Sequence, residues 1–134
     1  MKPPILKLAT WADYADVVDQ RMTILRAFSY MEVESLPVEC RCIAAIQIET
    51  DDLQSSTTLL LRLKDYEGTI AVELECLLEP HRTLTDRFLS QIVAEFHFEL
   101  KKHEYSLEMS LKENGAKLGE LALPVVTKHM LRNT

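Results

Sequence analysis

Three aspartates in the stretch TWADYADVVDQ, residues 10–20, have the spacing most suggestive of chemistry. They are Asp13, Asp16 and Asp19. Carboxylates three residues apart lie on one side of a helix, and Ca²⁺ needs several oxygens that converge on one point. The same acids are also typical of a short helix without a metal, because Thr10 and Asp13 have the spacing of a capping box and acids are favoured near a helix N-terminus.

A second acidic segment supports the alternative that the protein binds calcium or a small ligand. Residues 50–56 form a polar loop that contains Asp51 and Asp52. These two carboxylates would complete a site with the acidic residues 13–19. Neither segment contains the glycine of a calcium-binding loop, so the sequence by itself favours solvent-exposed aspartates and no bound metal.

Acid–base catalysis would most naturally use a histidine, and the chain has four. They are His81, His97, His103 and His129. His97 stands between Glu95 and Glu99, a pattern typical of the solvated face of a strand. His81 is close to Asp86 in the sequence, which leaves a weak hydrolase as a third possibility. No serine has a Gly-x-Ser-x-Gly setting and no glycine-rich phosphate loop is present, so we expect no catalytic residues, no cofactor and no enzyme.

The three cysteines are Cys40, Cys42 and Cys76. Cys40 and Cys42 project from the same face of an extended chain, as small core residues do. A zinc site would need a second close pair or a nearby histidine, which the sequence lacks. An odd number of cysteines without a regular spacing also predicts a reducing compartment.

Charge and hydropathy exclude two classes of partner. The net charge is −6 and the basic residues are scattered, whereas nucleic-acid binding needs a clustered basic face. No apolar run approaches the ~20 residues that span a bilayer. Residues 1–4 lack the features of a secretory signal. We therefore expect a cytoplasmic protein with no nucleic-acid or membrane partner.

The elements that would position these groups are mostly segments in which apolar and polar residues alternate. In residues 70–78, the apolar Ile70, Val72 and Leu74 are separated by residues that include Glu73, and this period of two predicts a half-buried strand. Turns are expected at Gly68 and at Asn114-Gly115. Eight strands are predicted, at residues 4–10, 21–32, 38–49, 57–65, 69–79, 91–100, 104–112 and 117–127.

Residues 11–18 have helical spacing instead, with Trp11, Tyr14, Ala15 and Val18 at i, i+3, i+4 and i+7. A further helical turn is expected near residues 84–89. The sequence thus predicts an all-β protein: one domain over residues 1–134, an antiparallel β-sandwich of immunoglobulin-like architecture with about eight strands and one short helix near 11–18.

Several short segments resemble a family of small bacterial proteins of unknown function. They are Ala12-Asp13-Tyr14-Ala15, residues 19–28 (DQRMTILRAF), Leu36-Pro37, the strand from Tyr105 to Leu111, Asn114-Gly115, and Leu123-Pro124-Val125. The chain departs from the family at Gln20 and Ala27, where the family often has glycine. The resemblance implies a β-sandwich and supplies no catalytic residues.

Residues 22–33 are apolar on both faces of a predicted strand. One interpretation is a strand buried on both sides, or a bulged one. The other is that one face meets a partner. The candidate interface residues are Met22, Leu25, Phe28, Tyr30 and Met31. We therefore expect a non-enzymatic cytoplasmic module for protein–protein interaction, with a homodimer as one form.

Overall fold

The computed structural model describes residues 3–51, 57–83 and 87–128, through which ten strands run. They are β1 (Ile5–Val18), β2 (Arg21–Phe28), β3 (Met31–Val33), β4 (Val38–Thr50), β5 (Thr58–Asp65), β6 (Ile70–Leu77), β7 (His81–Arg82), β8 (Phe88–Leu100), β9 (Glu104–Leu111) and β10 (Lys117–Thr127).

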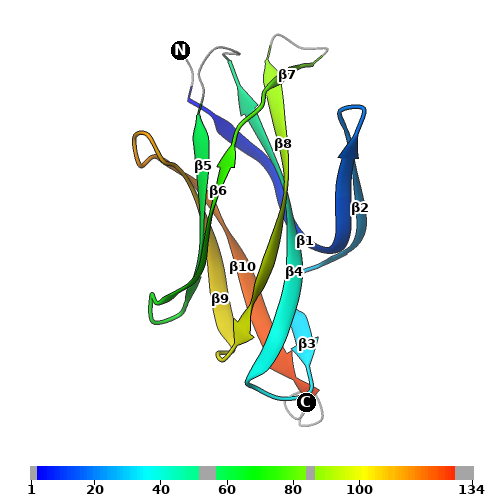
Figure 1. The fold of residues 1–134 in the computed structure, drawn as a ribbon, viewed down its shortest axis with the longest axis vertical. Coiled ribbons are helices and arrows are strands. Elements are labelled where there is room, and N and C mark those ends of the chain that lie inside the picture. The colour runs from blue at the N-terminus through cyan, green and yellow to red at the C-terminus, as the bar shows by residue number, and fades with distance from the viewer. Residues whose placement is uncertain (1–2, 52–56, 84–86, 129–134) are drawn as a thin grey trace.

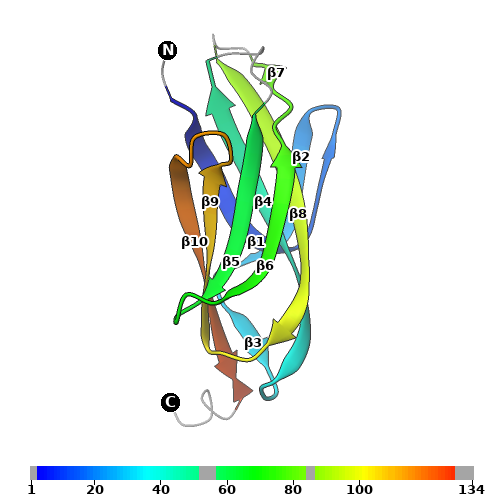
Figure 2. The same ribbon diagram turned by 60° about the vertical axis from the view of Figure 1, so that its left-hand side comes forward.

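The strands form two five-stranded sheets that pack face to face (Figure 1). Sheet A has the order β2-β1-β4-β8-β7, and sheet B has the order β3-β10-β9-β5-β6. Neighbouring strands are antiparallel except β3 and β10, which are parallel. The second view shows the long strands of the two sheets lying against each other (Figure 2). The predicted all-β sandwich is therefore confirmed.

The core lies between the sheets and follows from the alternation of apolar residues. In β8, Phe96, Phe98 and Leu100 are buried whereas Glu95 and His97 are exposed. A strand presents successive side chains to opposite faces, so each alternating segment covers the core on one side and meets water on the other. Gly68 and Gly115 adopt positive φ in the turns where glycine was expected.

The helix predicted near residues 11–18 is wrong, because this segment is the second half of β1. The strand pairs with β4 as far as Ala12 and with β2 from Trp11 to Val18. Its apolar residues have helical spacing because they are buried in two places: Trp11 in the main core, and Ala15 in a small cluster on the other face of β4. The Thr10 hydroxyl donates to the Trp11 carbonyl, so it caps no helix.

The single strand predicted at residues 21–32 is also wrong. The chain leaves sheet A at the end of β2 and enters sheet B as β3. This crossing explains why the segment is apolar on both faces. Met22 and Ile24 pack against the small cluster on β4, whereas Phe28 and Met31 pack against the main core. The helical turn expected near 84–89 falls partly on residues 84–86, outside the described residues, and Phe88 already belongs to β8.

Three non-glycine residues with positive φ shape the β1–β2 hairpin. Asp19 (φ 51°) and Gln20 (φ 62°) form its two-residue turn, as a type I′ turn requires. Arg26 (φ 55°) lies within β2, opposite Asp13 in the register of the two strands. The left-handed conformation is unfavourable for any residue with a Cβ, so Arg26 is a point of local strain where the hairpin changes direction.

The positive φ at Arg26 predicts that valine, which strands normally favour, is disfavoured at this position. Valine is normally favoured in a strand, but Arg26→Val should lower the free energy of unfolding by about 1–2 kcal/mol because a β-branched residue tolerates positive φ poorly. Arg26→Gly should stay within about 0.5 kcal/mol of the wild type, because relief of strain offsets the flexibility of glycine. Urea denaturation measures both, with Thr23→Val on the same strand as the control. An Arg26→Val variant as stable as Thr23→Val would contradict the strain.

Candidate interaction surface

The β1–β2 hairpin is folded back over the outer face of sheet A, at the right of the sandwich in Figure 1. Ile43 and Ala45 of β4 lie on the face opposite the main core and are nevertheless buried, because Ala15 of the hairpin packs against them. Gln91 of β8 donates its amide to the Gln20 carbonyl at the hairpin turn, 2.7 Å away. The hairpin is therefore held at its turn as well as at its base.

The outward side of the hairpin remains open to solvent, and we call it the hairpin face: Tyr14, Val18 and Leu25. Their side chains are 46%, 60% and 53% exposed. Tyr14 and Leu25 are direct cross-strand partners, and Val18 shares the side of Tyr14 by strand alternation. The Tyr14 hydroxyl donates to Asp16 at 2.8 Å, and this bond raises the pKa of Tyr14. The hydroxyl is thus occupied while the ring stays available for an apolar contact.

A depression of about 250 Å³ lies at the base of the hairpin. Its lining residues are Asp13, Phe28, Tyr30, Met31 and Glu32. Two aromatic rings and a thioether form its apolar part, and two carboxylates form its acidic part. It lies where the chain crosses from sheet A to sheet B.

The structure divides the five predicted interface residues into two groups. Leu25 and Tyr30 are exposed. Met22, Phe28 and Met31 are half-buried against the two apolar clusters, and Phe28 and Met31 also line the depression. Sequence reasoning missed Tyr14 and Val18, because a helical interpretation of residues 11–18 gives no reason to pair Tyr14 with Leu25.

The aspartates considered for calcium do not have the arrangement that a helix would give. On a strand, residues three apart point to opposite faces, so the spacing of Asp13 and Asp16 separates them. Asp13 faces Arg26, and Asp19 lies in the hairpin turn. Asp51 forms an ion pair with Arg87 at 3.3 Å, and Asp52 lies outside the described residues. Among the residues that the structure describes, no three His, Cys, Asp or Glu side chains are grouped as metal ligands.

The histidines are spread over the fold. His81 lines a shallow depression of about 150 Å³ with residues that include Gln20 and Gln91, while its suggested partner Asp86 lies outside the described residues, as does His129. His103 contacts the Val125 carbonyl through Nδ1. His97 contacts the Glu95 carboxylate on the exposed face of β8.

Glu95 belongs to a surface ion-pair group with Arg41 and His97. Two hydrogen bonds to the Glu95 carboxylate lower the pKa of Glu95 to about 2. The bond from Arg41 has the larger effect and the bond from His97 the next largest. The carboxylate is therefore ionised at neutral pH. All three side chains are exposed to solvent, Glu95 the least at 42%.

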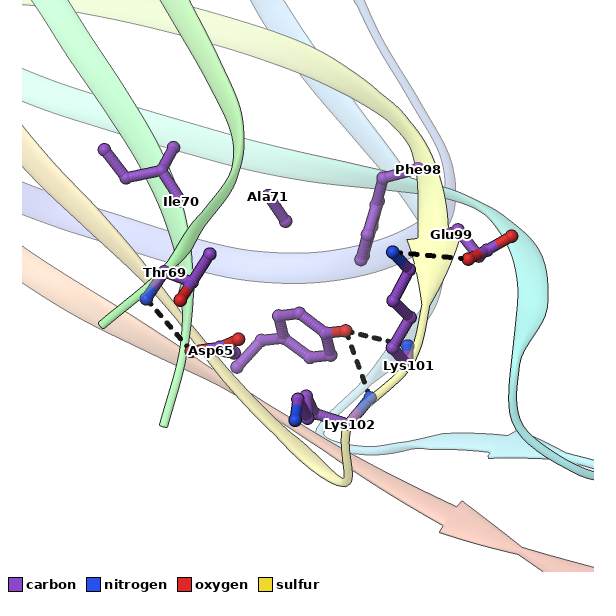
Figure 3. Close-up of a pocket in the computed structure, with 9 residues that line it drawn as sticks. Asp65, Thr69, Ile70, Ala71, Phe98, Glu99, Lys101 and Lys102 are labelled. Carbon is purple, nitrogen blue, oxygen red and sulfur yellow. Dashed lines mark hydrogen bonds and ion pairs between the residues drawn. The ribbon is translucent and has the colours of Figure 1, made fainter. Parts of the chain in front are cut away.

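A second depression, of about 260 Å³, opens where β8 ends beside the start of β6 (Figure 3). Phe98, Tyr105, Lys101 and Lys102 are among the residues that line it. The Tyr105 hydroxyl accepts from the backbone N–H groups of both lysines, at 2.9 and 3.2 Å. The Lys101 ammonium pairs with Glu99, and that of Lys102 pairs with Glu67, so both cations already have anionic partners.

Comparison with known proteins gives no match, either to a protein-family model or to a curated sequence. The described residues contain no helix long and apolar enough to cross a bilayer.

Proposed function

We propose that this protein is a non-enzymatic interaction module of the bacterial cytoplasm, related to the small bacterial family that its motifs resemble, and that it binds a second copy of itself through the hairpin face and the free edge of β2. The observation that carries the proposal is the exposure of Tyr14, Val18 and Leu25 together on a hairpin that is held in place at its turn. Large apolar side chains grouped on one exposed face are typical of interaction surfaces.

The free edge of β2 is the second element of the proposed contact. β2 pairs with β1 on one side and ends sheet A on the other. An edge strand presents unpaired N–H and C=O groups that can pair with another strand. Two β2 strands related by a two-fold axis would pair antiparallel and extend sheet A into its copy.

Both elements are needed, because apolar burial alone is modest. Fully burying a large apolar side chain contributes about 1.5–3 kcal/mol. The three hairpin-face residues are already about half-buried, so completing their burial contributes roughly 2–4 kcal/mol in total. The loss of translational and rotational freedom opposes association by at least that amount. Main-chain hydrogen bonds between the two β2 strands have to supply the rest of the free energy of association. We therefore predict a dimer of moderate affinity.

Light scattering coupled to size exclusion tests this dimer. At about 50 μM, well above a Kd of about 1–10 μM, the mass should be near twice 15.4 kDa. Leu25→Glu should give a monomer with an unchanged circular dichroism spectrum, because Leu25 is 53% exposed in the single chain.

Leu77→Glu is the matched control. Leu77 is 56% exposed and lies on β6, the edge strand of sheet B, so the same charge introduced there should leave the dimer intact. A single species of 15.4 kDa at about 50 μM would reject the dimer. Equal dissociation by both substitutions would show that the hairpin face is not the contact.

A further inference from the structure

Arg21, the first residue of β2, has a charge that no described residue of its own chain neutralises. Within the described ranges, every lysine and arginine side chain forms an ion pair with an aspartate or a glutamate except Arg21 and Arg82. Arg21 is exposed and lies on the edge strand of sheet A. Its guanidinium is therefore available to an acceptor outside the chain.

The depression of about 250 Å³ at the base of the hairpin has the complementary composition. Asp13 and Glu32 contribute two carboxylates to its lining, and Phe28 and Tyr30 contribute two aromatic side chains. A guanidinium is planar and weakly hydrated, so it can stack on an aromatic face and bond to a carboxylate at the same time. The lining thus has the chemistry that recognises an arginine side chain.

The groups of this lining have capacity for such a ligand. Among the residues that the structure describes, Glu32 forms no ion pair, and the rings of Phe28 and Tyr30 contact neither another ring nor a cation. Asp13 pairs with Arg26 at 3.9 Å, but both side chains are more than half exposed, so solvent screens the pair. Glu32 is therefore the main acceptor that the depression offers.

The proposed dimer brings the unpaired arginine and the depression together. Antiparallel pairing of two β2 strands across a two-fold axis lays the start of each strand beside the end of the other. Arg21 is the first residue of β2, and Phe28, which lines the depression, is the last. A shift of the pairing by one residue moves the contact by about 3.3 Å, which the long arginine side chain can cover.

We propose that, in this dimer, the depression of each chain binds the side chain of Arg21 of the partner subunit. The guanidinium stacks on the aromatic lining and pairs with Glu32, and Asp13 is a second acceptor. The two-fold axis produces this contact twice in each dimer. The contact rests on the proposed dimer and fixes the register of its two β2 strands, which main-chain pairing alone leaves free to slip.

Charge reversals at the two ends of the contact test it. Arg21→Glu brings two acidic side chains together, and Glu32→Arg brings two basic ones together, at both copies of the contact. Each variant alone should dimerise at least about 10-fold more weakly than the wild type, because like charges oppose each other at an interface. Sedimentation velocity over about 1–200 μM measures these affinities. Both residues are exposed, so the circular dichroism spectra should remain those of the wild type.

An equimolar mixture of the two variants gives the most specific result. In a mixed dimer, the acidic side chain introduced at position 21 meets the basic side chain introduced at position 32, and the other contact is the native one. We expect the mixture to dimerise at concentrations where each variant alone is a monomer. A role of either residue within its own chain would not give this recovery. A mixture that stays monomeric would overturn the proposal, as would an Arg21→Glu variant that dimerises as tightly as the wild type.

Arg82→Glu is the matched control. Arg82 is the other exposed cation that has no ion pair with a described residue, and it lies on β7, the opposite edge strand of sheet A from β2. The same reversal of charge there should change the dimer affinity by no more than about 2-fold. Equal weakening by Arg21→Glu and Arg82→Glu would show a general effect of net charge and reject the site. A wild-type chain that stays a monomer at about 50 μM would instead reject the dimer itself, and the contact with it.

Discussion

Replacing Trp11 by alanine is expected to lower the free energy of unfolding by about 3–5 kcal/mol, a large part of the stability of a typical domain. Trp11 is completely buried in the main core. Its ring packs edge-to-face on Phe96 with 5.8 Å between ring centroids, and its Nε1 donates to the Ala122 carbonyl at 2.9 Å. Trp11 belongs to sheet A and Ala122 to sheet B, so one side chain fills the core and joins the two sheets.

Guanidinium denaturation followed by near-ultraviolet circular dichroism of the remaining aromatic residues measures this loss. Trp11→Phe separates the two contributions, because it retains most of the apolar contact and leaves the Ala122 carbonyl without its donor. We expect a smaller loss of about 1–3 kcal/mol for that variant. Tyr14→Ala, three residues away and 46% exposed, should change stability by no more than about 0.5 kcal/mol in the monomer. A similar loss for Trp11→Ala and Tyr14→Ala would contradict the strand assignment of β1.

Tyr105→Phe is the second substitution for which we expect a large effect, a loss of about 1–3 kcal/mol in the free energy of unfolding. Tyr105 is 3% exposed, and its hydroxyl accepts from the backbone N–H groups of Lys101 and Lys102 in the short connection between β8 and β9 (Figure 3). Phenylalanine keeps the ring contact with Phe98 but leaves two backbone donors without their acceptor.

Thermal and urea unfolding measure the loss, and amide hydrogen exchange locates it. Exchange at Lys101 and Lys102 should accelerate in Tyr105→Phe, whereas the middle of β8 should be unaffected. Tyr30→Phe removes the hydroxyl of a side chain that is 50% exposed and should be neutral within about 0.5 kcal/mol. Equal stability of the two variants would show that the Tyr105 hydroxyl has no structural role.

The candidate surface could be predicted only in part from the sequence. The excess of apolar residues in 22–33 correctly indicated that they are not all covered by one sheet, and Leu25 and Tyr30 are indeed exposed. Met22 and Phe28 are half-buried, because a bent hairpin provides two separate apolar clusters for one strand. Residue types alone do not reveal that bend, since Arg26 is not a residue that usually adopts positive φ.

The sequence by itself determined the all-β class and most of the strands. Alternation is a local property that any segment with one wet face must show, as in β8, and the turn residues Gly68 and Gly115 mark where such segments end. Tertiary structure decided the conformation of residues 11–18. Trp11 and Ala15 are buried in two different clusters, and the spacing of these buried residues is the same as that on one face of a helix. Tertiary structure also decided the contact of Met31 with Cys40, because the crossing of the chain between the sheets brings β3 against β4, and no local pattern encodes a contact between strands of different sheets.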